Sequence, residues 1–148
     1  MALRGAFLSL CLLLPLCSRA EEIERFALVV GQNRPDRPGR PLLLYADDDA
    51  IRMHLLLTQA GVSSFLLANP DSETKSQYPD VTPAARPGRQ TLFSTFAAIN
   101  KSMGERLSAG RQVEFIFFFS GHGDIEHGQG QLVLEDGRLS RDELGQLL

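Results

Sequence analysis

The sequence predicts an α/β domain: a doubly wound, mainly parallel sheet of the three-layer (α/β/α) type. Residues 25–31 and 113–119 are apolar runs rich in β-forming residues, and neither alternates with polar residues. Parallel strands that are covered on both faces have this pattern. Segments with helical periodicity separate the apolar runs. The resulting order, β-α-β-α-β followed by a hairpin and a helix, is typical of doubly wound sheets.

The first half of the chain supplies two strands and a helix. The strand over 25–31 ends at a glycine, and the three prolines of 32–41 predict a loop. The carboxylates of 47–49 precede an apolar run and suit the positive end of a helix dipole. Gly61 ends this helix, and 62–68 is predicted to be the second strand.

A long loop and a second helix come next. Residues 69–89 contain four prolines and many small polar residues, which predicts a surface loop. Whether this loop is a lid or a processing site stays open. The helical period returns at Gln90 and leads to the run at 113–119, which we expect to be a central strand. The apolar face of the helix comprises Leu92, Phe93, Phe96, Ile99, Met103 and Leu107.

The segment after the most apolar strand is rich in glycine. Residues 120–124 leave the carboxyl end of that strand, and 125–130 are expected to form a loop. A short strand over 131–135 and a tight turn at 136–137 follow. Residues 140–143 match a capping box, Ser-x-x-Glu, that starts the final helix.

The first twenty residues have the pattern of a secretory signal peptide. Arg4 provides a positive region, 6–17 is an apolar run, and Ser18-Arg19-Ala20 places small residues at a cleavage site. The expected mature domain is therefore 21–148, exported to the periplasm or the extracellular space. An uncleaved anchor is the alternative, although the apolar run is shorter than the ~20 residues of a membrane span. No membrane partner is expected for the mature form.

Composition restricts the possible chemistry and partners. The formal net charge is −3, and no basic stripe stands out, so nucleic acid is not an expected partner. Cys11 and Cys17 are the only cysteines of the sequence, and both lie in the predicted signal peptide. The mature chain therefore has neither a disulfide nor a thiol nucleophile.

His122 is the strongest candidate for a catalytic residue. It follows the most apolar strand and lies between Gly121 and Gly123, which permit unusual backbone angles and close approach of a substrate. Ligands of doubly wound sheets bind beyond the carboxyl ends of the strands, where the strand order reverses. A histidine there can act as a general acid or base, and the Gly123 amide can bind an oxyanion. The alternative is a histidine that merely ends a strand.

Four segments in the same order resemble the caspase-like peptidases, a family that includes caspases, metacaspases and bacterial relatives. Phe-Ser-Gly-His-Gly-Asp at 119–124 is similar to the histidine motif of the family. Residues 26–33 resemble its first strand and turn, and 44–50 its acidic helix start. Residues 131–134 together with 139–144 resemble the hairpin and helix after the histidine. The resemblance covers about 25–148.

The resemblance implies a thiol protease, a hydrolase in which a cysteine and a histidine cleave peptides or proteins. His122 then takes the general acid/base role and Gly123 the oxyanion role. The family carries its cysteine on the strand after the helix that begins here at Ser140, and this sequence lacks that strand. We therefore expect a domain that is incomplete at its C-terminus and needs the missing part for activity. The alternative is a non-catalytic binding or regulatory module.

The resemblance offers two conflicting specificity residues. Asp49 aligns with a metacaspase aspartate that helps to bind a basic P1 side chain, although helix capping explains it equally well. Arg34 lies near the loop in which caspases keep an arginine for acidic P1 residues. His122, Asp124 and His127 fit no zinc signature, so no metal and no cofactor are expected.

Overall fold

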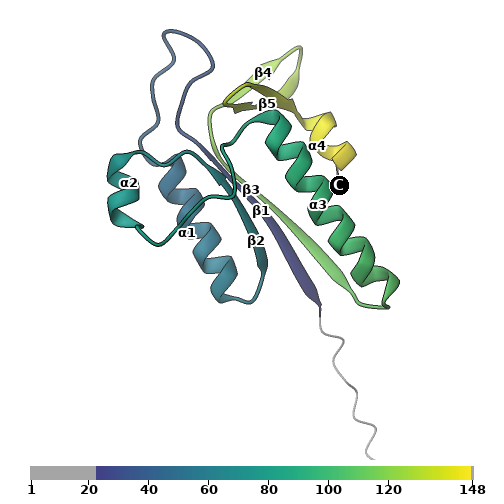
Figure 1. Cartoon of the computed structure of the whole chain (residues 1–148). Helices are drawn as coiled ribbons and strands as arrows, with labels where there is room; N and C mark the ends of the chain where they lie inside the picture. Colours follow the sequence, from purple (N-terminus) through teal and green to yellow (C-terminus); the bar gives the residue numbers. More distant parts are fainter. Residues whose placement is uncertain (1–22, 148) are drawn as a thin grey trace, which may run out of the picture.

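The computed structural model describes residues 23–147. The predicted signal peptide, with Cys11 and Cys17, lies outside the described residues. Figure 1 shows a sheet with helices on both of its faces and a small hairpin sheet at one end. The described elements are β1 (Glu24–Gln32), α1 (Ala46–Gln59), β2 (Ser63–Ala68), α2 (Ser72–Gln77), α3 (Arg89–Ser108), β3 (Val113–Gly121), β4 (Gly123–Glu126), β5 (Gln129–Leu134), β6 (Gly137–Ser140) and α4 (Arg141–Leu147).

The main sheet is parallel, with the strand order β2-β1-β3, which confirms the α/β class. In its register, Phe26 of β1 lies opposite Ser63 of β2 and Phe115 of β3. The central strand of the described sheet is therefore β1, and the prediction that 113–119 forms the central strand is wrong for these residues. An apolar run indicates that both faces of a strand are covered. It does not indicate that both edges are paired.

Two apolar layers hold the helices against β1. On one face, α3 packs through Leu92, Phe96 and Ile99 onto Phe26, Leu28 and Val30. On the other face, α1 packs through Ala50 and Ile51 onto Ala27 and Val29. This second contact is close at Gly31, where a Cβ atom would lie 2.6 Å from the Ala46 carbonyl oxygen. The glycine at the end of β1 therefore allows α1 to approach the sheet.

The apolar face predicted for α3 is correct except in the last turn. Leu107 is 56% exposed, although it follows the same period as the buried Ile99. Arg106 pairs with Glu24, the first residue of β1, at 3.1 Å. The last turn of α3 therefore lies at the end of the sheet, where few residues of the sheet are available to cover Leu107. Within residues 23–147, no helix is long and apolar enough to cross a membrane.

The segment 69–89 differs from the long loop that was predicted. It contains α2, which Asp71 caps by accepting a hydrogen bond from the Thr74 amide at 2.9 Å. Thr74 is buried and donates its hydroxyl to Asp48 Oδ2 at 3.1 Å. Farther along, the Ala68 amide donates to the Ala85 carbonyl at 3.1 Å, which attaches the segment to β2. Much of this segment is therefore fixed to the body of the domain.

The glycine-rich loop predicted at 125–130 is instead a hairpin of β4 and β5. His127 and Gly128 turn it with φ values of 51° and 79°, and two positive φ values define the tight turns that suit hairpins. The capping box is confirmed, since the Ser140 amide donates to Glu143 Oε2 at 2.9 Å and the Glu143 amide donates to Ser140 Oγ at 3.2 Å.

Candidate active site

The fold places the carboxyl ends of β1 and β3 side by side. Gln32, the last residue of β1, lies opposite Gly121, the last residue of β3. The chain moves from β1 to β2 on one side, then crosses to β3 on the other side of β1. The strand order therefore reverses between β1 and β3, which is where doubly wound sheets bind ligands. His122 follows β3 directly at this point.

Two hydrogen bonds hold His122 in place. Its backbone carbonyl accepts from the Val133 amide of β5 at 2.9 Å. Its ring Nε2 lies 2.8 Å from the Pro41 carbonyl oxygen, in the loop 33–45. Because a carbonyl only accepts, Nε2 carries the proton and donates it in this bond. The other nitrogen, Nδ1, is then the basic atom of the neutral ring and is able to take a proton.

The two glycines beside His122 do not adopt the unusual backbone angles that the sequence suggested. Neither Gly121 nor Gly123 has a positive φ. A Cβ atom at Gly121 would lie 2.6 Å from Cζ of Phe119, so this glycine is needed for close packing. Gly123 begins β4, and a Cβ atom there would lie 3.7 Å from the Gln131 carbonyl oxygen, an ordinary contact.

Asp49 lies in the first turn of α1, beside the end of β3. Its side chain is exposed, and its Oδ2 accepts a hydrogen bond from Ser120 Oγ at 3.2 Å. Another residue caps the helix: Asn33 Oδ1 accepts from the amides of Ala46 at 2.8 Å and Asp47 at 3.3 Å. Sequence reasoning missed Asn33 because it precedes the helix by a whole loop, whereas caps are sought directly before a helix.

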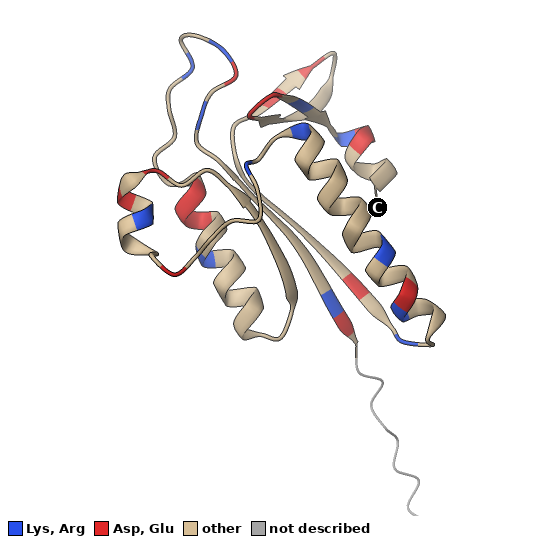
Figure 2. Cartoon of the chain, viewed as in Figure 1, with Lys and Arg blue, Asp and Glu red and all other residues tan. Residues whose placement is uncertain are grey.

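A charged cluster of Asp36, Arg40, Asp124 and Arg138 fastens the loop 33–45 to the hairpin sheet. Arg40 Nη2 donates to Asp124 Oδ2 at 2.7 Å, and Arg138 Nη2 donates to Asp36 Oδ2 at 2.6 Å. Figure 2 shows charged residues of both signs on this loop and on the neighbouring hairpin. Arg40 precedes Pro41, so the charged cluster fixes the position of the carbonyl that contacts His122.

The carboxyl groups of this cluster are stabilised as anions. The hydrogen bond from Arg40 lowers the pKa of Asp124, and the hydrogen bond from Arg138 lowers the pKa of Asp36. Arg40 Nη1 lies 3.2 Å from Asp36 Oδ1, yet it is buried without a hydrogen-bond partner. The contact between Arg40 and Asp36 is therefore an ion pair with poor hydrogen-bond geometry.

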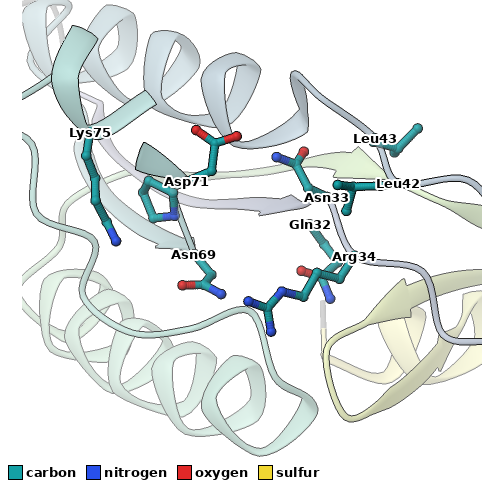
Figure 3. Close-up of a pocket in the computed structure, with 9 residues that line it drawn as sticks. Gln32, Asn33, Arg34, Leu42, Leu43, Asn69, Asp71 and Lys75 are labelled. Atoms are coloured by element: carbon teal, nitrogen blue, oxygen red, sulfur yellow. The ribbon is translucent and has the colours of Figure 1, made fainter. Parts of the chain in front are cut away.

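Arg34 follows the carboxyl end of β1 and faces the hairpin sheet. Its side chain is 62% exposed and stands 3.8 Å from Glu135 Oε1. It also lines a cavity at the carboxyl ends of β1 and β2 (Figure 3). Of the four candidate residues, His122, Gly123 and Asp49 therefore adjoin the end of β3, whereas Arg34 follows β1 and contacts Glu135.

No metal centre is formed within residues 23–147, where no three side chains of His, Cys, Asp or Glu converge. The carboxylate of Asp124 is engaged by Arg40, and His127 lies in the hairpin turn.

Comparisons with protein-family models, with curated proteins and with solved structures gave no match for this chain.

Proposed function

We propose that this chain is the histidine-bearing part of an exported cysteine endopeptidase domain of the caspase-like type. The observation that carries the proposal is the hydrogen bond from His122 Nε2 to the Pro41 carbonyl, at the edge where β1 and β3 end. This bond orients the ring and leaves Nδ1 as a base. Nucleophilic catalysis by a thiol uses a base whose position is fixed, and ligands of doubly wound sheets bind where the strand order reverses.

In the proposed reaction, His122 Nδ1 removes the proton of a cysteine thiol. The thiolate forms a C–S bond with the peptide carbonyl carbon, and the Gly123 amide binds the resulting oxyanion. The C–N bond then breaks as His122 returns the proton to the leaving amine. Water hydrolyses the thioester, with His122 again acting as the base.

The cysteine has to come from outside residues 21–148, which contain none. Within the described sheet, β3 pairs with β1 along one edge, and its other edge is unpaired. The resemblance to caspase-like peptidases implies a further strand, with the cysteine at its carboxyl end. A parallel strand paired with the open edge of β3 would bring that end beside His122.

For the specificity of the proposed peptidase, the position of Asp49 favours a basic P1 residue. Its exposed carboxylate contacts Ser120, two residues before His122, whereas Arg34 contacts Glu135 and lines a cavity whose lining does not include His122. A carboxylate near the site binds an arginine or lysine side chain through charge-assisted hydrogen bonds.

The test is a cleavage assay on the protein translated from the whole reading frame that contains this chain. Fluorogenic peptides with Arg, Lys or Asp at P1 are the substrates. His122→Ala should lower kcat by about 100-fold or more, the usual contribution of a general acid/base. His127→Asn is the matched control, because Asn tolerates the positive φ at this turn position. Cleavage that survives both His122→Ala and thiol alkylation would refute the proposal.

A non-catalytic binding module is the second candidate, favoured by the lack of any cysteine in 21–148. Such a protein would bind peptides without cleaving them. The two candidates separate in the same assay, since a module that binds the peptides but releases no product belongs to the second.

A further inference from the structure

A cavity of about 350 Å³ opens at the carboxyl ends of β1 and β2 (Figure 3). The residues that line it are Gln32, Asn33, Arg34, Leu42, Leu43, Asn69, Pro70, Asp71 and Lys75. The loop 33–45 borders both this cavity and His122: Pro41 contacts His122, and the next two residues line the cavity. His122 itself is not among the lining residues.

The side-chain amide of Gln32 lines this cavity without a hydrogen-bond partner. Gln32 is only 2% exposed, yet its side chain makes no hydrogen bond to any of the residues that the structure describes. Figure 3 shows its amide among the lining groups. The Gln32 amide atoms are not enclosed, because Arg40 Nη1 is the one enclosed side-chain atom without a partner in the described residues. The amide can therefore hydrogen-bond to a polar molecule in the cavity.

The charged residues that line the cavity are Arg34, Lys75 and Asp71, so cations outnumber anions there. Lys75 makes no ion pair within residues 23–147, and Arg34 has only the long contact with Glu135. Asp71 Oδ1 accepts from the Thr74 amide at 2.9 Å, and this bond lowers the pKa of Asp71, so its carboxylate is an anion. In Figure 3, the polar ends of Arg34, Lys75, Asn69 and Gln32 point to one side, and the Asp71 carboxylate points away from them.

We propose that this cavity binds a small organic anion with a carboxylate or phosphate group. Arg34 and Lys75 neutralise the anionic group, and the Gln32 amide donates a hydrogen bond to it. Leu42 and Leu43 provide an apolar wall for the rest of the molecule, and Leu42 is largely exposed. A mostly preformed cavity with a few converging polar groups is the usual form of a small-molecule site.

Isothermal titration tests this site without any peptidase activity. The protein is the chain fused to a soluble carrier domain, with the carrier alone as the blank. The probes are N-acetylglutamate, its uncharged analogue N-acetylglutamine, and inorganic phosphate. N-acetylglutamate should bind saturably and N-acetylglutamine should not. Competition by phosphate would show that either type of anionic group suffices, and its absence would assign the site to carboxylates.

The variants identify the residues. Arg34→Gln and Lys75→Gln should each weaken binding of N-acetylglutamate by about tenfold, the effect of one charge-assisted hydrogen bond. Arg86→Gln is the control for Arg34, because both arginines contact Glu135 and Arg86 does not line the cavity. Lys101→Gln, on the exposed side of α3, is the control for Lys75. Equal binding by all four variants, or no saturable binding of either anion, would overturn the proposal.

Discussion

Replacement of Asp47 by alanine should destabilise the domain more than any other single change at the carboxyl ends of the strands. This carboxylate is 1% exposed. It accepts hydrogen bonds from Asn33 Nδ2 at 2.7 Å, from the Asp48 amide at 3.0 Å and from the Asp71 amide at 3.1 Å. Asp47 thus ties the segments that follow β1 and β2 to the start of α1.

The expected loss follows from the burial of the three donors. The Asp48 amide is buried and would lose its partner without access to water, while the other two donors are partly buried and can be rehydrated. With ~1–3 kcal/mol for a buried unsatisfied donor and less for the others, we expect a loss of about 3 kcal/mol. Asp47→Asn keeps the carbonyl oxygen but cannot accept at its nitrogen, so about half of this loss is expected.

Urea unfolding followed by circular dichroism measures the loss as a change in midpoint at constant slope. Asp80→Ala is the control, because Asp80 is exposed in the same part of the chain, and its change should stay within about 0.5 kcal/mol. Limited proteolysis should also cut the segments after β1 and β2 faster in Asp47→Ala. A stability of Asp47→Ala within 0.5 kcal/mol of the parent would refute the reasoning.

Three further predictions concern packing, pH and the open edge. Gly31→Ala places a methyl group against α1 and should lower the free energy of unfolding in urea by about 2 kcal/mol. Gly104→Ala, with open space around it, should stabilise α3 by up to about 1 kcal/mol. Equal effects of the two substitutions would contradict the close packing of Gly31 against α1. A hydrogen bond from Arg89 lowers the pKa of Glu143 from 4.5 to about 2. The stability that this pair contributes is therefore present above pH 4.5 and lost as the pH falls toward 2. When the unfolding midpoint is measured over this pH range, the midpoint of Glu143→Gln should fall less than that of the parent. The unpaired edge of β3 should make the chain self-associate when it is produced alone, and a monomer with a sharp cooperative melt in ultracentrifugation and calorimetry would contradict this.

The sequence predicted the three main strands and the two long helices because their signals are local. Apolar runs and helical periods identified β1, α1, β2, α3 and β3, and the capping box located α4. The strand predicted over 131–135 and the turn after it are confirmed by the pairing of β5 with β6. The strand β4 was missed, because its turn to β5 depends on His127 at a positive φ, which is uncommon for a residue other than glycine. The helix α2 was hidden among prolines, and its Thr74 is buried through a contact with Asp48, far away in the sequence.

In the candidate site too, the sequence predicted the position of a residue but not its tertiary contacts. The position of His122 after β3 follows from the order of the elements, so the sequence was sufficient to locate it. The bond to the Pro41 carbonyl could not be predicted, because it depends on how the loop 33–45 folds back. Arg34 of that loop was the candidate for substrate binding. The pairing of Arg40 with Asp124 could not be predicted, because only tertiary structure brings these two residues together.

The reactivity of a thiol beside His122 tests the central claim most directly. The whole translated protein and its His122→Ala variant are treated with a peptide carrying a thiol-reactive chloromethyl ketone and a P1 arginine, and the labelled residue is identified by mass spectrometry. The account predicts rapid labelling of one cysteine, other than Cys11 and Cys17, that depends on His122. No labelling, or the same labelling rate in His122→Ala, would contradict it.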